Sequence, residues 1–177
     1  MLQHFSLMNT SKRIFLVFLT LVALWCAGIL LAPLLKSAGL SASSILYSFY
    51  SSICHQIDGR SLHLAGHKLG VCARCASLYL GFFLALLIYP FLRTLQMKQV
   101  PGRLWLFIGV APMIVDVLLN ITGLHASTIA TRTVSGLFFG ALLPFYLVPP
   151  LLEAVTQVID RLPSRGGLTY ARKTEQV

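Results

Sequence analysis

Four long apolar stretches, nearly free of charge, constrain the fold of this chain more than any other feature of its sequence. An α-helix needs about 20 mostly apolar residues to cross the hydrocarbon core of a bilayer, and each stretch is close to that length. The sequence predicts spans over residues 14–35, 75–92, 104–121 and 133–152. We therefore expect an all-α integral membrane protein with about four transmembrane helices, built as a single membrane domain over residues 1–177.

The composition supports a membrane protein and bears on its partners. Residues of the AVILMFWYC set make up 56% of the chain and charged residues only 11%, whereas a soluble domain carries roughly 25% charged residues. The net charge of +9 would suggest nucleic acid in a soluble protein. Here it fits Lys and Arg at the ends of membrane helices, where they contact anionic lipid. We expect membrane lipids, and not nucleic acid, as partners.

The distribution of Lys and Arg predicts an orientation. With the N-terminus inside, nine basic residues fall in inner segments and five in outer ones, so the positive-inside rule favours both termini in the cytoplasm. The loop over residues 36–74 is then extracytoplasmic, and residues 153–177 form a cytoplasmic tail. The first part of the loop mixes serines with apolar residues, which predicts an interfacial or re-entrant segment.

A cluster of cysteines and histidines lies between the first and second spans. Three of the four cysteines and three of the five histidines fall between Cys54 and Cys75. A C-x-x-C pair places two sulfurs within chelating distance, and one Cys and one His from the preceding loop can complete a tetrahedral zinc site. The predicted ligands are Cys54, His67, Cys72 and Cys75, with His63 as the alternative histidine.

The same cysteines allow two other readings. In an oxidising compartment Cys72 can pair with Cys75, or one of the two with Cys54, as a disulfide. Alternatively, Cys72 and Cys75 form a redox-active dithiol, because the helix dipole and Arg74 both lower the pKa of a thiol at the start of the second span. The sequence leaves metal, disulfide and dithiol open.

Asp116 interrupts the third span. An Asp at the centre of a membrane helix costs about 2.5–3.5 kcal/mol on insertion scales, so such residues usually have partners. Arg132 begins the fourth span near the same membrane face and can reach inward, which predicts an Asp116–Arg132 pair. Gly136 and Gly140 form a small-xxx-small pattern that lets helices approach closely. We expect this face of the fourth span to pack on the third.

Titratable groups that converge at one membrane face usually mark a functional site. We expect zinc either to order the loop or to support chemistry on a lipid-like substrate, with Asp116, Arg132 and His55 as candidate catalytic residues. One alternative is a membrane thiol-disulfide oxidoreductase that uses Cys72 and Cys75. Another is a non-enzymatic accessory subunit of a larger membrane complex. The sequence leaves open whether the protein is an enzyme.

The chain contains the short blocks Cys54-His-Gln56, Arg60-Ser61, Gly66-His67, Val71-Cys-Ala-Arg-Cys75 and Tyr79-Leu-Gly81, with Pro112, Asp116, Arg132 and Gly136 further along. These blocks resemble a family of predicted bacterial multi-span membrane proteins, domain of unknown function 2085. The resemblance covers about residues 45–150. Gly70 departs from it where a proline is common, Ala76-Ser77 where Thr-Gly is common, and Val117 where a glycine is common. It implies a multi-pass protein of the bacterial cytoplasmic membrane with a Cys/His motif, and it brings no established activity.

Overall fold

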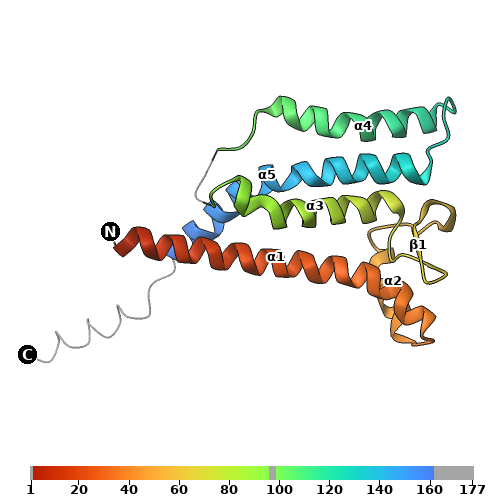
Figure 1. Cartoon of the computed structure of the whole chain (residues 1–177), viewed down its shortest axis with the longest axis horizontal. Helices are drawn as coiled ribbons and strands as arrows, with labels where there is room; N and C mark the ends of the chain where they lie inside the picture. The colour runs from red at the N-terminus through yellow and green to blue at the C-terminus, as the bar shows by residue number, and fades with distance from the viewer. Residues whose placement is uncertain (1, 96–98, 162–177) are drawn as a thin grey trace, which may run out of the picture.

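The computed structural model describes residues 2–95 and 99–161, and these are mostly helical (Figure 1). The long helices are α1 (Leu2–Ser37), α3 (Ala73–Leu92), α4 (Arg103–Ile121) and α5 (Ile129–Arg161). Their parts that are long and apolar enough to cross a membrane are Thr10–Ser37, Ala73–Leu92, Arg103–Ile121 and Ile129–Ile159. The prediction of an all-α membrane protein with four spans is confirmed.

The short elements gather at one end of the bundle, between α1 and α3. They are α2 (Ala42–Ser51), the 3-10 turn η1 (Asp58–Arg60), β1 (His63–Leu64) and β2 (His67–Lys68). The segment that joins α4 to α5 reaches the same end (Figure 1). We call this end, with residues 38–72 and 122–128, the loop end. The predicted Cys/His-rich loop between the first two spans is therefore present, and α2 is its short helical segment.

The hairpin of β1 and β2 is antiparallel and closes with a two-residue turn. Leu64 pairs with His67, and His63 pairs with Lys68. Ala65 and Gly66 both have positive φ, at 51° and 79°, as a type I′ turn requires. This tight turn fixes the register of the two strands.

The closest approach between long helices is that of α3 and α5. A Cβ atom on Gly140 would overlap the carbonyl of Leu78, and one on Gly81 would overlap the carbonyl of Leu137. Gly136 lies against Ser77 in the same way. The face of α5 that carries Gly136 and Gly140 thus packs on α3, and not on the third span as predicted. The reason is that α3 carries small residues, Ser77 and Gly81, at matching spacing, so that the two backbones can meet.

Two apolar clusters tie α1 to this helix pair. Phe15, Tyr89 and Val148 belong to the one that joins α1, α3 and α5 away from the loops. The other lies at the loop end and contains Tyr50 and Cys54 together with residues of α1 and α3. Hydrogen bonds lock it, because the Tyr50 hydroxyl donates to the Trp25 carbonyl at 2.8 Å and the Gly70 N–H donates to the Ile29 carbonyl at 3.2 Å.

Helix α5 runs further than the predicted span. It continues through Pro149 and Pro150 to Arg161, so the first part of the predicted tail is helical, while residues 162–177 lie outside the described residues. Membrane helices tolerate proline when neighbouring groups satisfy the freed carbonyls. Burial of Val148 and Leu152 in the cluster with α1 and α3 also favours continuation of the helix.

We expect the α3–α5 contact to be sensitive to a single methyl group. Gly140→Ala places a Cβ against the Leu78 carbonyl, so the helices must separate, which destabilises by about 1–3 kcal/mol. Gly59→Ala is the matched control, since nothing lies within 4 Å of its added Cβ, and a change within about 0.5 kcal/mol is expected. Unfolding in mixed detergent micelles measures both. Equal stability of the two variants would contradict the packing.

Candidate metal centre

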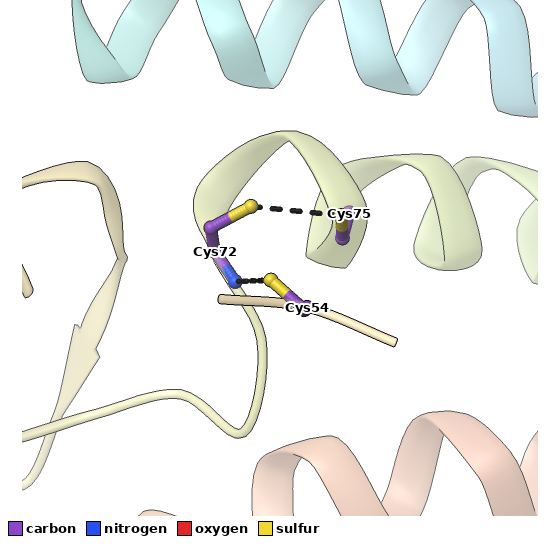
Figure 2. A group of neighbouring side chains, drawn as sticks. All are labelled: Cys54, Cys72 and Cys75. Atoms are coloured by element: carbon purple, nitrogen blue, oxygen red, sulfur yellow. Dashed lines mark hydrogen bonds between the residues drawn. The ribbon is translucent and has the colours of Figure 1, made fainter. Parts of the chain in front are cut away.

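Three cysteines from two separate segments meet at the loop end (Figure 2). The sulfurs of Cys54, Cys72 and Cys75 all lie within 4.8 Å of one another. Cys54 follows α2, and its N–H donates to the Tyr50 carbonyl at 3.0 Å. Cys72 is the N-cap of α3, and Cys75 lies in the first turn of that helix. The start of a membrane span thus supplies two sulfurs, and the loop supplies the third.

The spacing of the sulfurs suits a tetrahedral cation. Zinc–sulfur bonds are about 2.3 Å long, so two sulfurs on a tetrahedral zinc lie about 3.8 Å apart. The Sγ atoms of Cys72 and Cys75 are 3.5 Å apart. All three cysteines are free thiols in this structure, so none of the three disulfides that the sequence allows is formed. Thiolate sulfur is a ligand that zinc prefers, and the donor set fits this metal.

The surroundings favour an ionised sulfur at this place. The Cys72 N–H donates to the Cys54 Sγ at 3.2 Å, which holds the two cysteine-bearing segments together. The hydrogen bond with Cys75 lowers the pKa of Cys72 to about 5, against the opposing effect of burial, and bonds with backbone groups of Cys75 and Arg74 and with Cys54 add to the lowering. A nucleophilic or metal-binding thiolate is therefore available at neutral pH.

The histidines lie outside this group of sulfurs. Within residues 2–95 and 99–161, the ligand atoms that come together are those of the three cysteines. His67 is held in the hairpin by its pairing with Leu64, and the Nε2 atom of His63 lies 3.2 Å from an Asp58 carboxylate oxygen. His55 is exposed beside Cys54. The structure thus brings together three of the four predicted ligands and leaves the predicted fourth, His67, in the hairpin.

Gln56 clamps the two cysteine-bearing segments, a role that sequence reasoning missed. Its side-chain amide donates to the carbonyls of Tyr47 and Gly70, both at 2.8 Å. Lys68 donates to the Gln56 carbonyl at 2.7 Å. Gln56 has a positive φ of 49°, which is uncommon for a residue other than glycine. The sequence indicates this role only through the position of Gln56, directly after Cys54 and His55.

A buried ion pair adjoins the sulfurs. Asp116, 8% exposed, accepts hydrogen bonds from the Arg74 guanidinium and from the Ser127 hydroxyl, the latter at 2.7 Å. Asn120, one turn further along α4, accepts from the Ser127 N–H at 3.2 Å. The residue between the two cysteines of the C-x-x-C motif thus binds the membrane carboxylate, so the sulfurs and the ion pair share one helical turn.

The predicted partner of Asp116 was wrong. Arg132 does not form the ion pair, and its Nε donates instead to the Ser127 carbonyl at 3.4 Å. The physical reason is the packing of α5. Arg132 precedes Gly136 by one turn, on the face that meets α3, whereas Arg74 extends from the start of α3 to Asp116 and Ser127. The sequence analysis considered Arg74 only for its effect on the thiols and not as the partner of Asp116, and it did not identify Ser127.

Removing either partner of the ion pair should destabilise the bundle. Arg74→Gln or Asp116→Asn leaves one buried charge without its partner, which costs about 3 kcal/mol. The double variant should be no less stable than either single one, because no unpaired charge is left. Asp58→Asn is the control, since that carboxylate is exposed. Unfolding of all four variants in micelles gives the coupling free energy, and a coupling near zero would refute the pairing.

The reactivity of Cys72 should follow its lowered pKa. In metal-free protein, iodoacetamide should alkylate Cys72 at close to its maximal rate at neutral pH. The rate should decline as the pH falls through about 5, because only the thiolate reacts. Cys75→Ala removes the main stabilising hydrogen bond, so the midpoint should rise toward the ordinary value of 9.0. Mass spectrometry of the labelled peptide measures the rate. An unchanged midpoint in Cys75→Ala would count against the stated cause.

Comparison with known proteins places this chain in a family. Residues 54–146 match the model of a family described as a predicted membrane protein, DUF2085. The chain is 34% identical over 150 residues to an uncharacterized protein of Methanocaldococcus jannaschii, a match that covers 81% of this chain and 96% of that protein. No solved structure matches. The relative is archaeal, so the bacterial origin implied by the resemblance is not confirmed. The matched segment holds all three clustered cysteines, Arg74 and Asp116, and the chain belongs to the DUF2085 family of predicted membrane proteins.

Proposed function

We propose that this membrane protein binds one zinc ion through Cys54, Cys72 and Cys75, and that the metal holds the loop over residues 38–72 against the end of the helix bundle. One observation carries the proposal: three sulfurs, from segments 18 residues apart in the chain, lie within 4.8 Å of one another, close enough for a single cation to bind them. The start of α3 positions two of the sulfurs, and the hydrogen bond of the Cys54 N–H to the Tyr50 carbonyl positions the third.

Binding energy supports a structural role. Zinc contributes about 10–16 kcal/mol to folding in peptide models at neutral pH. The segment between α1 and α3 has little apolar core of its own. Its buried residues in the loop-end cluster are Tyr50, Cys54, Leu69 and Val71. Cross-linking Cys54 to the first turn of α3 through a metal therefore fixes the segment far more firmly than its packing does.

Three protein ligands leave one position on a tetrahedral ion. His67 stays our predicted fourth ligand, and it requires a shift of the hairpin toward the sulfurs. If the position is instead taken by water, the ion has the arrangement of catalytic zinc sites and supplies Lewis acidity. Asp116 is engaged by Arg74 and Ser127, which favours a structural role for it over that of a general base. His55, exposed next to Cys54, stays a candidate proton carrier in that case.

The charges on the bundle support the proposed orientation. Basic residues at the end opposite the loops include Arg93, Arg103 and Arg161, at the ends of three helices. By the positive-inside rule this end faces the cytoplasm, and the loop end with its sulfurs faces outward. The membrane is then a cytoplasmic membrane, with lipids as the surroundings of the spans.

A thiol-disulfide oxidoreductase is the second candidate function. The position of Cys72 at a helix N-cap, with the sulfur of Cys75 at 3.5 Å, favours it. In such an enzyme Cys72 attacks the disulfide of a substrate to form a mixed disulfide. Cys75 then attacks Cys72, which releases the substrate as a dithiol and leaves the Cys72–Cys75 disulfide.

A non-enzymatic accessory role rests on the exposed apolar face of α4, where Phe107 is 68% exposed.

Metal analysis of the detergent-purified full chain tests the proposal. We expect one equivalent of zinc in the native protein and less than about one tenth of it in Cys54→Ser, Cys72→Ser and Cys75→Ser, because loss of one thiolate removes a ligand. Cys26→Ser is the matched control and should keep its zinc, because the Cys26 sulfur lies apart from the cluster and contacts the Tyr79 carbonyl at 3.5 Å.

Thiol counting on the same samples separates the two candidates. When a chelator removes zinc from the loaded protein, three reactive thiols should become detectable without a reductant. If no metal is found and two thiols are detected only after reduction, the zinc proposal fails and the oxidoreductase is supported. His67→Ala decides the fourth ligand, since retention of full zinc affinity in that variant leaves the position to water.

A further inference from the structure

Three arginines lie near one another at the loop end, on three different elements. Arg60 ends η1, Arg74 lies in the first turn of α3, and Arg132 lies in the first turn of α5. Arg74 and Arg132 both reach Ser127, Arg74 at the hydroxyl (3.5 Å) and Arg132 at the carbonyl (3.4 Å), and Arg60 is near enough for its charge to act on the guanidinium of Arg132. The nearby carboxylate, Asp116, forms its ion pair with Arg74. Positive charge is therefore in excess at this place.

Some guanidinium N–H donors of Arg132 and Arg74 have no hydrogen-bond partner in the described part of the chain. Arg132 is only 7% exposed, yet among the described residues its guanidinium makes a single hydrogen bond, the long one of 3.4 Å from Nε to the Ser127 carbonyl. A guanidinium has five N–H donors. The Nε of Arg74 is buried and has no hydrogen-bond partner in the described part of the chain. Buried charged donors are costly unless a partner satisfies them.

Other acidic groups do not balance this charge. Asp58, next to Arg60 in the chain, is exposed and contacts the His63 ring. The charge of Cys72 also acts on Arg132, and its thiolate offsets one positive charge. Cys72 and Asp116 together supply two negative charges against three guanidinium groups, so positive charge stays in excess.

We propose that Arg132, Arg74 and Arg60 form a binding site for a phosphate-type oxyanion, either free or as the headgroup of a membrane lipid. The forked geometry of guanidinium groups suits the oxygens of phosphate, which accept paired hydrogen bonds. Arg132 and Arg74 lie within the first turns of two spans, at the depth where basic side chains reach the interface. Arg74 lies between Cys72 and Cys75 in the chain, but the anion would bind the guanidinium groups and not the sulfurs, so this proposal does not depend on the zinc proposal.

Binding to the purified full chain tests this site with two probes. Inorganic phosphate is titrated by calorimetry, and lipid binding is measured in vesicles of phosphatidylglycerol against vesicles of phosphatidylcholine. We expect Arg60→Gln to weaken binding by about tenfold, the loss of one charge-assisted contact. Because Arg60 is exposed, this variant should keep its fold. Arg132→Gln should weaken binding by more, and Arg132→Lys, which keeps the charge without the fork, should lie between.

Lys36→Gln is the matched control, because it removes one positive charge from the same end of the bundle but lies at the end of α1. Its affinity should stay within twofold of the native value. Binding of inorganic phosphate without a preference for phosphatidylglycerol identifies a free anion as the ligand, and a preference for phosphatidylglycerol without phosphate binding identifies a headgroup. The proposal is overturned if neither probe binds, or if Arg60→Gln and Arg132→Gln bind like the native protein.

Discussion

The close contact of α3 and α5 is the constraint on which the rest of the structure depends. In lipid, apolar surface gains little by leaving one apolar environment for another, so helices associate through close packing and polar contacts. Gly81 on α3 and Gly136 and Gly140 on α5 allow this packing. It brings the first turn of α3 beside the start of α5, and that turn carries Cys72, Arg74 and Cys75. Without this approach neither the sulfur cluster nor the ion pair has a rigid support.

The first turn of α3 joins the loop to the membrane-spanning part in both directions. Toward the loop, the N–H of Cys72 donates to the sulfur of Cys54, and Gln56 ties the same segment to Gly70. Toward the membrane, Arg74 binds Asp116 on α4 and lies 3.5 Å from the Ser127 hydroxyl before α5. A displacement of this turn therefore changes the geometry of the sulfurs and of the ion pair together, which gives the loop and the spans a physical means of coupling.

Much of this arrangement could be predicted from the sequence, and the errors share one cause. The length of the apolar stretches identified the four spans, because each helix that crosses a bilayer needs about 20 apolar residues in a row, whatever its neighbours are. The C-x-x-C spacing and Cys54 identified the sulfur cluster, because chelation needs only a few residue types at short spacing. The partner of Asp116 and the partner of Gly140 depend on which spans are neighbours. Arg132 and the third span are the nearest candidates along the chain, whereas the structure joins Asp116 to Arg74 and α5 to α3. The fourth ligand stays a prediction, because the hairpin holds His67 by a turn that its distance from Cys72 in the sequence does not reveal.

The ion pair has a particular importance for α4. This helix packs mainly on α5, where Gly109 lies against the side chain of Leu142, and most of its large apolar residues are exposed on the surface of the chain. Its polar connection to α3 runs through Asp116 and Arg74. The same Arg74 has an unused buried donor and belongs to the arginine cluster. An oxyanion bound there competes with Asp116 for the guanidinium, so that binding would weaken the attachment of α4 to α3 while it adds charge balance at Arg132. The position of α4 and the occupancy of the arginine cluster are thus thermodynamically linked, and each must influence the other by the same free energy.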